Sequence, residues 1–314
     1  MAVVWDGMTD ARVRAMAPDA FDAFDRVAAL VGGAAEPVLV ELARRHIGGV
    51  LGATDSQVEA DGVLSEGKAA ALAGWPSAPG LSAAERVCVG MAEQFALDVG
   101  STTSAQRTAL SDALGPEAFG FVQVLYALDS AVRVRRALRQ LFGAEPASSA
   151  ALKGDATTLW PALEELMRVV ARMGAVDPLT TELVRLRGAR AHDCRLCKSR
   201  RHVVVVEAGA DEATFDQIDW YESSDLSQRH KVALRLTDAV IWQPAAYPGE
   251  LPSQVRASFA PEEALEIIFD VSRNAANKIA VALGADQPTV ADGIEYFDTD
   301  ERGGLILGVC PGAN

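Results

Sequence analysis

The chain has 314 residues, of which 49% are hydrophobic and 23% charged, so it can bury a large core and is neither disordered nor fibrous. Its 29 Lys and Arg against 43 Asp and Glu give a net charge of −14, which argues against a nucleic-acid or anionic-membrane surface over the whole molecule. No apolar run approaches the roughly 20 residues of a membrane span, and the acidic start is unlike a signal peptide. With only four cysteines, we expect a cytoplasmic protein in a reducing compartment.

Short motifs recur along the chain in the same order, which indicates an internal duplication. Residues 37–44 resemble 178–185 at a shift of 141, and residues 81–87 resemble 226–232 at a shift of 145. Weaker matches further along keep the second shift. A nearly constant shift with one small insertion is typical of an old duplication.

Two related domains are therefore expected. We place the first repeat over 1–150 and the second over 151–286, joined by the Gly-, Pro- and Ser-rich stretch 142–155. Residues 287–314 are rich in Gly, Asp and Pro, and we expect them to form an irregular C-terminal tail.

The predicted elements are helices throughout. Aromatic residues make up only 6%, while Ala, Leu, Val, Glu and Arg are plentiful, which favours an all-α fold over a β-sandwich. In the first repeat, a helix is expected from about Pro116 to Leu141, ended by Gly143. In the second repeat, Pro178 suits the first turn of a helix.

Three further helices are expected in the second repeat. One covers about 193–209 and includes the β-branched run 203–206, although such a run also fits a strand. Another covers 227–241. The last is a long helix over 260–284 that ends at a glycine.

A Cys-x-x-Cys pair, Cys194 and Cys197, requires a chemical explanation in a reducing compartment. Residues three apart share one face of a helix, so a small adjustment of a first turn closes a disulfide. We expect Asp193 to cap the helix and Cys194 to take its first position, where backbone N–H groups stabilise a thiolate.

Positive charge is concentrated around this pair. Seven bases lie between positions 185 and 201 against the single acid Asp193: Arg185, Arg187, Arg190, Arg195, Lys198, Arg200 and Arg201. We expect a cationic pocket that lowers the pKa of a thiol and attracts an anionic substrate group. The pattern indicates a redox-active dithiol, in which one thiolate attacks an oxidised substrate and the other closes a disulfide.

The arrangement of Glu182, eleven intervening residues and the Cys194–Cys197 pair resembles the alkylhydroperoxidase AhpD-like, or carboxymuconolactone decarboxylase, superfamily. The Glu-Ala-Gly-Ala-Asp run at 207–211 and the Trp-Tyr-Glu-Ser-Ser-Asp-Leu-Ser run at 220–227 also resemble that family. The resemblance covers about 160–285 well and about 35–142 as a degenerate first copy.

The resemblance implies an AhpD-like multihelical fold and a peroxidase-type reaction on a hydroperoxide or a similar oxidised small molecule. It places Glu182, Cys194 and Cys197 at catalytic positions, with Glu182 acting as base or proton relay. We expect Cys197 to attack, because it lies deeper in the expected helix beside Arg201, and Cys194 to resolve. The resemblance also implies a homo-oligomer, with a trimer favoured, and a thioredoxin-like or lipoyl-type protein as reductant. No metal or other cofactor is expected.

One position departs from the family pattern. The family places His four residues after the second cysteine, where this chain has Arg201, which stabilises a thiolate but cannot accept a proton. His202 is the next residue, turned by roughly 100° around a helix. Either His202 or His192, which precedes the pair, is a candidate assistant to Glu182.

Further residues are candidates for binding the substrate. Arg185 belongs to the expected cationic pocket, and His192 precedes the dithiol. Trp220 is a candidate wall of the pocket, although it also suits simple packing before the next helix. Asn274 and Asn277 are unfavourable in the middle of a helix and are expected to face the pocket or a solvated surface.

The first repeat is expected to lack an active site. It retains Glu41 at the position that corresponds to Glu182. Ala53 and Ser56 occupy the positions that correspond to the two cysteines. We therefore expect one active site per chain and a structural first half.

Other interpretations of the dithiol remain open. The two thiols also fit inert core residues, or a zinc site with His192 and His202, although four ligands within eleven residues are unusually compact. The chain also fits a non-catalytic oligomeric scaffold with a relic dithiol. A last alternative is a cofactor-free decarboxylase-like enzyme that acts on a carboxylated intermediate through the cationic pocket.

Overall fold

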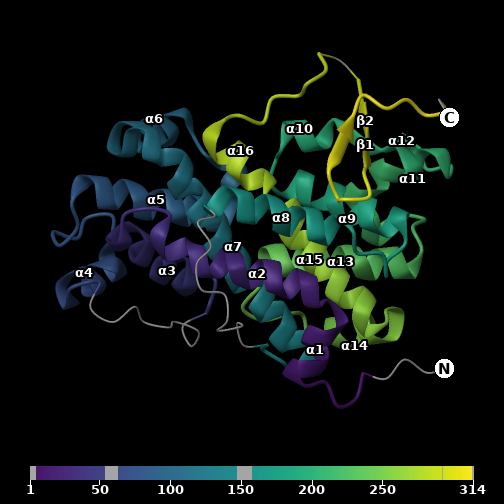
Figure 1. The fold of residues 1–314 in the computed structure, drawn as a ribbon, viewed down its shortest axis with the longest axis horizontal. Coiled ribbons are helices and arrows are strands. Elements are labelled where there is room, and N and C mark those ends of the chain that lie inside the picture. Colours follow the sequence, from purple (N-terminus) through teal and green to yellow (C-terminus); the bar gives the residue numbers. More distant parts are fainter. Residues whose placement is uncertain (1–4, 54–62, 147–157, 292, 313–314) are drawn as a thin grey trace.

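The computed structural model describes residues 5–53, 63–146, 158–291 and 293–312 of the chain. Helices make up most of these residues, and a three-stranded sheet lies at the upper right of the view in Figure 1. The expectation of a predominantly helical, all-α fold is therefore confirmed. Within the described ranges, no helix combines the length and the apolar character needed to cross a membrane.

The elements in the described part of the first half are all helical. The α-helices are α1 (Asp10–Met16), α2 (Pro18–Leu30), α3 (Pro37–Val50), α4 (Glu66–Ala71), α5 (Ala83–Asp98), α6 (Ser104–Leu114) and α7 (Ala118–Phe142). Short 3-10 segments join some of them: η1 (Val31–Gly33), η2 (Leu72–Gly74), η3 (Val99–Ser101) and η4 (Gly115–Glu117).

The second half contains helices and the sheet. Its helices are α8 (Leu159–Ala171), α9 (Pro178–Ala191), α10 (Arg195–Lys198), α11 (Val203–Glu207), α12 (Glu212–Asp216), η5 (Gln217–Ser223), α13 (Gln228–Trp242), α14 (Leu251–Ser258), α15 (Pro261–Asn274) and α16 (Asn277–Leu283). Its strands are β1 (Arg200–His202), β2 (Glu295–Thr299) and β3 (Leu305–Leu307).

Helix bounds in the two halves correspond at the shifts found between the sequence motifs. Helices α2 and α8 have equal lengths and begin 141 residues apart, as do α3 and α9. Helix α13 begins 145 residues after α5. The duplication stays a prediction, and the boundary expected at residue 150 lies outside the described residues.

The two halves share one hydrophobic core. Helix α2 packs against α8, and the long α7 contacts both α15 and α16. Phe21 of α2 meets Phe269 of α15 edge to face, with ring centroids 5.2 Å apart. The hydroxyl of the fully buried Tyr126 in α7 donates to the Ser272 carbonyl at 2.9 Å. Each half therefore completes the core of the other.

Proline and glycine mark the helix ends as expected. Pro178 and Pro261 begin α9 and α15, and Gly143 ends α7 with a left-handed φ of 63°. The expected single helix over 260–284 is wrong in one respect, because it breaks between Asn274 and Asn277. The two asparagines therefore flank a break instead of lying mid-helix, where their side chains compete with backbone hydrogen bonds.

The expected continuous helix over 193–209 is wrong. The single-turn α10 is followed by strand β1, and only then does the β-branched run form helix α11. Strand β1 pairs in parallel with β2, with Arg200 opposite Glu295 and His202 opposite Phe297. Pairing with a distant segment has overridden the local helical tendency.

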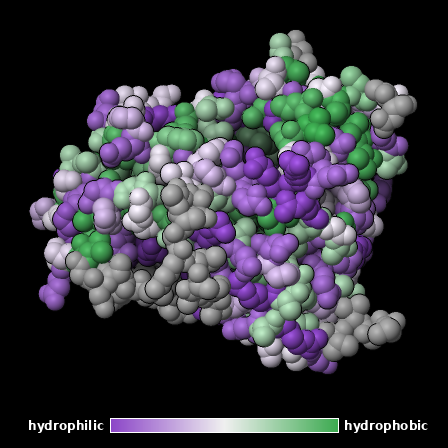
Figure 2. Space-filling model, viewed as in Figure 1, coloured by the Kyte–Doolittle hydropathy of each residue, from purple (hydrophilic) through white to green (hydrophobic). Residues whose placement is uncertain are grey.

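The C-terminal tail is not irregular throughout, contrary to expectation. Its strand β2 lies between β1 and β3, and β3 runs antiparallel to β2 along the edge of the sheet. Leu305, Ile306 and Leu307 of β3 are exposed, and Figure 2 shows a hydrophobic area over this part of the molecule. The tail thereby returns to the segment that follows the dithiol.

Candidate functional site

The two thiols lie at the start of α10 and face each other. The Sγ atoms of Cys194 and Cys197 are 2.7 Å apart, about 0.7 Å more than a disulfide bond. The expected cap is wrong by one residue, because Cys194 itself caps α10 and its Sγ accepts the Cys197 N–H at 3.2 Å. Asp193 has a left-handed φ of 52° and pairs with Lys198 instead.

The environments of the two sulfur atoms differ. Cys194 is fully buried, whereas Cys197 is partly exposed. The hydrogen bond from Cys194, followed by the charge of Arg185, the amide of Asn277 and the charge of Arg200, lowers the pKa of Cys197 to about 7 against the effect of burial. The same hydrogen bond and burial raise the pKa of Cys194. Cys197 is the thiolate of the pair and Cys194 the proton donor.

Glu182 and Arg185 of α9 form a buried ion pair behind the thiols. Arg185 donates to both carboxylate oxygens of Glu182 at 2.6 and 2.7 Å. The backbone N–H of His202 donates to the same carboxylate at 3.2 Å. Arg185 also donates to the carbonyls of Cys197 at 3.0 Å and Arg200 at 2.7 Å. Glu182 therefore acts on the dithiol through Arg185.

The expected cationic pocket is largely wrong, because all seven bases have carboxylate partners. The pairs are Arg185–Glu182, Arg187–Asp238, Arg190–Asp219, Arg195–Asp286, Lys198–Asp193, Arg200–Glu295 and Arg201–Glu212. Most of these acids lie far outside the segment in which the bases were counted. Only Arg185 and Arg200 are among the main causes that lower the pKa of Cys197.

Arg201 does not act on the thiols in this arrangement. It pairs with Glu212 at 2.9 and 2.6 Å, and its guanidinium carbon lies 5.2 Å from the centre of the Phe215 ring. The strand is the reason, because side chains alternate between its faces and Arg201 points opposite to Arg200 and His202. The expectation that Arg201 stabilises the thiolate directly is wrong.

His202 lies on the side of the sheet that faces the ion pair. Its ring is 5.0 Å from that of Phe297, and its Nε2 is 3.4 Å from Asp298. Burial lowers the pKa of His202, while the nearby Glu182 opposes the shift. The structure therefore brings His202 to Glu182, although by a strand and not by a helix.

His192 and Asn277 connect the dithiol to α16. His192 Nδ1 and Asn277 Oδ1 are 2.8 Å apart, and the Asn277 amide contributes a hydrogen bond to the Cys197 sulfur. Burial lowers the pKa of His192 to about 3, so its ring is neutral at physiological pH. These two predicted binding residues lie at the thiols.

Asn274 and Trp220, the remaining predicted binding residues, differ in their surroundings. Asn274 is at the end of α15, and its Nδ2 is a buried donor with no hydrogen-bond partner among the described residues. Trp220 lies in η5 and is 53% exposed. Trp220 thus has the exposure of a surface residue and not of a pocket wall.

Three residues of the site were not predicted from the sequence. The buried Asp286 accepts the Arg195 N–H at 2.9 Å and its guanidinium at 2.6 Å, which anchors α10. Phe297 of β2 lies 5.1 Å from the Arg185 guanidinium carbon. Arg273 is an electrostatic neighbour of both Arg185 and Glu182. Asp286 ends the expected second repeat and Phe297 lies in the tail, and no local pattern marked either residue.

The predicted zinc alternative has no support in this geometry. No group of three or more His, Cys, Asp or Glu side chains is placed to hold a metal ion in the part of the chain that the structure describes. His192 is instead bonded to Asn277, and His202 lies against Phe297 and Asp298.

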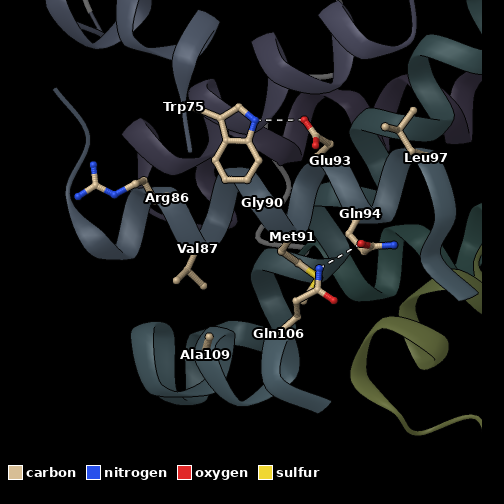
Figure 3. A pocket seen from close by; sticks show the side chains of 10 residues that line it. All are labelled: Trp75, Arg86, Val87, Gly90, Met91, Glu93, Gln94, Leu97, Gln106 and Ala109. Atoms are coloured by element: carbon tan, nitrogen blue, oxygen red, sulfur yellow. Dashed lines mark hydrogen bonds between the residues drawn. The ribbon is translucent and has the colours of Figure 1, made fainter. Parts of the chain in front are cut away.

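The first half repeats part of the site without the thiols. Glu41 pairs with Arg44 and Arg45 at 3.2 and 2.9 Å, much as Glu182 pairs with Arg185. Ala53 is buried, and Ser56 lies outside the described residues. A hollow of about 310 Å³ between α5 and α6 is drawn in Figure 3, where Trp75 donates to Glu93 at 3.1 Å. No cysteine lines this hollow.

Two mycobacterial proteins are similar to this chain over most of their length. They are the uncharacterized proteins Rv2313c (strain H37Rv) and MT2376 (strain CDC 1551) of Mycobacterium tuberculosis, each 42% identical over 233 residues. The match covers 72% of this chain and 82% of each relative. The chain belongs to their family. No protein-family model matches the chain, and no solved structure matches it significantly.

Proposed function

We propose that the chain is a thiol-dependent oxidoreductase of the alkylhydroperoxidase type, which reduces hydroperoxides or similar oxidised small molecules. The observation that carries the proposal is the asymmetric thiol pair. Its sulfur atoms are 2.7 Å apart, one is fully buried and the other partly exposed with a lowered pKa. Such a pair supplies a nucleophile and a resolving thiol without further rearrangement.

The reaction has two steps within the protein. The Cys197 thiolate attacks the terminal oxygen of the hydroperoxide, the O–O bond breaks, and the alkoxide leaves and takes a proton from solvent to become an alcohol. Cys197 is then a sulfenic acid. Cys194 attacks that sulfur, its proton joins the departing hydroxide as water, and a disulfide forms.

The surrounding residues hold this pair in place. Because Arg185 occupies both oxygens of Glu182, we assign Glu182 a positioning role, in which it fixes Arg185 beside Cys197. The neutral His192 orients Asn277, whose amide then faces the thiolate. Arg201 is held by Glu212 and takes no part in the chemistry.

The catalytic cycle also needs an external dithiol. We propose that a thioredoxin-like or lipoyl-type protein reduces the disulfide and is itself oxidised. We further propose a cytoplasmic homo-oligomer, with a trimer favoured, as the resemblance to the superfamily implies.

Steady-state turnover of a hydroperoxide with a dithiol reductant tests the proposal. Cys197→Ser is expected to abolish turnover, and Cys194→Ser to allow oxidation of Cys197 without disulfide formation. The exposed Cys310 provides the matched control, since Cys310→Ser leaves the pair intact. Turnover of a carboxylated lactone that survives both active-site substitutions would support the decarboxylase-like alternative and contradict the proposal.

A further inference from the structure

Arg273, in the last turn of α15, is a partly buried cation whose electrostatic neighbours are Asp270, Arg185 and Glu182. Its side chain forms no hydrogen bond or ion pair with any residue that the structure describes, whereas all seven bases between 185 and 201 have a carboxylate. Burial lowers the pKa of Arg273, the charge of Asp270 opposes this shift, and the like charge of Arg185 adds to it. A desolvated guanidinium in this position lacks the anion that such groups normally bind.

The two acids that act on Arg273 electrostatically, Asp270 and Glu182, form no ion pair with it in the described structure. Both oxygens of Glu182 accept hydrogen bonds from Arg185. Asp270 is 2% exposed, and one of its oxygens has no hydrogen-bond partner among the described residues. Burial raises the pKa of Asp270 to about 8, so this carboxyl is mainly protonated at neutral pH.

Asn274, the next residue, adds a second unsatisfied donor. Its buried Nδ2 has no acceptor in the described structure. Its Cβ lies against Gly188 of α9, where an added methyl group would be 3.9 Å away. Three residues further, after the break between α15 and α16, Asn277 reaches His192 and the sulfur of Cys197. Arg273, Asn274 and Asn277 therefore follow one another along the contact between α9 and α15–α16, towards the thiolate.

We infer that Arg273 and Asn274 form an anion-binding subsite that holds a carboxylate of the oxidised substrate while its reacting group meets Cys197. A planar guanidinium binds a carboxylate through two parallel hydrogen bonds, and an amide N–H adds a third. This inference rests on the proposed function and deepens it, because it specifies an anionic substrate. The favoured substrates are hydroperoxides of organic acids, in preference to neutral hydroperoxides.

Alkylation of Cys197 tests the subsite without requiring any peroxidase activity. Iodoacetate and iodoacetamide have nearly the same size, and each transfers its carbon to the thiolate as iodide leaves, but only iodoacetate carries a carboxylate. Rates are measured on the reduced full-length protein by mass spectrometry of the peptide that contains Cys197. Arg273→Met is expected to slow iodoacetate about tenfold and iodoacetamide about twofold at most.

Two further variants make the result specific. Arg273→Lys keeps the charge but not the two parallel N–H donors of the guanidinium, so it is expected to retain part of the preference for iodoacetate. Lys198→Met is the matched control, since it removes a charge next to Cys197 that already pairs with the exposed Asp193. Its ratio of the two rates is expected to stay within twofold of wild type. Circular dichroism establishes that each variant is folded.

The possible results separate the subsite from the proposed function. Equal slowing of both reagents in Arg273→Met overturns the subsite, and so does a Cys197 that neither reagent reaches in the folded protein. A preference for iodoacetate that depends on Arg273, in a protein that hydroperoxides do not oxidise, supports the subsite and contradicts the proposed function. Oxidation of the protein by hydroperoxides, without a preference for iodoacetate that depends on Arg273, supports the proposed function and contradicts the subsite.

Discussion

The sulfur of Cys197 has neighbours from several elements that are distant in sequence. Arg185 comes from α9, Arg200 from β1 and Asn277 from α16, and Cys194 completes the set from the start of α10. Each donor or charge favours the thiolate, whereas burial favours the thiol. The reactivity of Cys197 therefore depends on tertiary structure and not on the Cys-x-x-Cys sequence alone.

Replacing Arg185 tests this dependence. After the hydrogen bond from Cys194, the guanidinium charge of Arg185 is the next cause that lowers the pKa of Cys197, so Arg185→Met is expected to raise that pKa. The thiolate is the reacting form, so the rate of alkylation by iodoacetamide rises with pH through the pKa and its inflection moves to higher pH. Arg187→Met, on the same helix but paired with Asp238, is the control. An inflection that stays at its wild-type pH in Arg185→Met contradicts the assignment.

Asp270 predicts a pH dependence of stability. Its folded pKa of about 8 lies above the unfolded value of about 3.9, so the folded state holds an extra proton between these values. The free energy of unfolding therefore falls as pH rises towards 8, by roughly 1 kcal/mol per pH unit from this residue. Asp270→Asn is expected to remove that loss. Denaturant titrations at pH 5 and pH 8 measure it, and an equal effect of the substitution at both values would contradict the prediction.

At the level of elements, the small sheet supports the dithiol from outside the helical core. Strand β1 continues directly from α10, and its partner β2 brings Phe297 against both Arg185 and His202. Asp286, which precedes β2, holds the start of α10. The C-terminal segment therefore positions the residues that surround the thiols.

Truncation of Phe297 tests the contribution of the sheet. Phe297 is 6% exposed, so Phe297→Ala is expected to destabilise the protein by about 3 kcal/mol. Loss of the ring also frees Arg185, which is expected to raise the pKa of Cys197. Ile306→Ala, on the exposed edge strand, is expected to change stability by less than about 0.5 kcal/mol. Equal effects of the two substitutions on stability and on thiol reactivity would contradict a supporting role for β2.

The helices were predictable from local signals, and the sheet was not. Pro178 and Pro261 mark helix starts because proline fits the first turn, and Gly143 and Gly284 mark ends because glycine adopts positive φ. Strand β1 was missed because its partner is 95 residues away and its own sequence, Arg-Arg-His, has no strand pattern. The acids that neutralise the seven bases were missed for the same reason, since Asp238, Asp286 and Glu295 reach them only in the folded chain.

Parts of the candidate site were also predictable from the sequence. Glu182, Cys194 and Cys197 were identified because their arrangement resembles that of the superfamily. In the structure the two thiols face each other, and Arg185 connects Glu182 to the backbone of Cys197. The cap was misplaced by one residue because the left-handed Asp193 has no signal that distinguishes it from an ordinary cap. The side chain of Arg201 was expected on the wrong side, because the segment is a strand and not a helix. Successive side chains of a strand alternate between its two faces.

For the molecule as a whole, a buried ionic cluster links the two halves. Lys278 of α16 donates to Asp129 of α7 at 2.8 Å, and Arg133 donates to the other oxygen of Asp129 at 3.0 Å. Arg133 also donates to the carbonyls of Val240 and Ala96. All three charged side chains are buried, so the cluster fixes how the halves meet.

Removing one member of this cluster is expected to destabilise the whole chain. Lys278→Met leaves Arg133 and Asp129 with an altered balance of buried charge. The free energy of unfolding is therefore expected to fall by about 3 kcal/mol. Arg235→Met, which removes the exposed pair with Glu222, is the control and is expected to cost less than about 1 kcal/mol. The two values are measured by denaturant unfolding. A similar small loss in both variants would contradict a structural role for the cluster.

The most direct measurement is the redox state of the Cys194–Cys197 peptide after the reduced protein meets one equivalent of a hydroperoxide. We expect a peptide lighter by two hydrogens, with an intramolecular disulfide, and its return to the dithiol form on treatment with a reductant. A peptide that keeps both thiols, or that stops at sulfenic acid on Cys197 without bridging to Cys194, would contradict a redox-active dithiol.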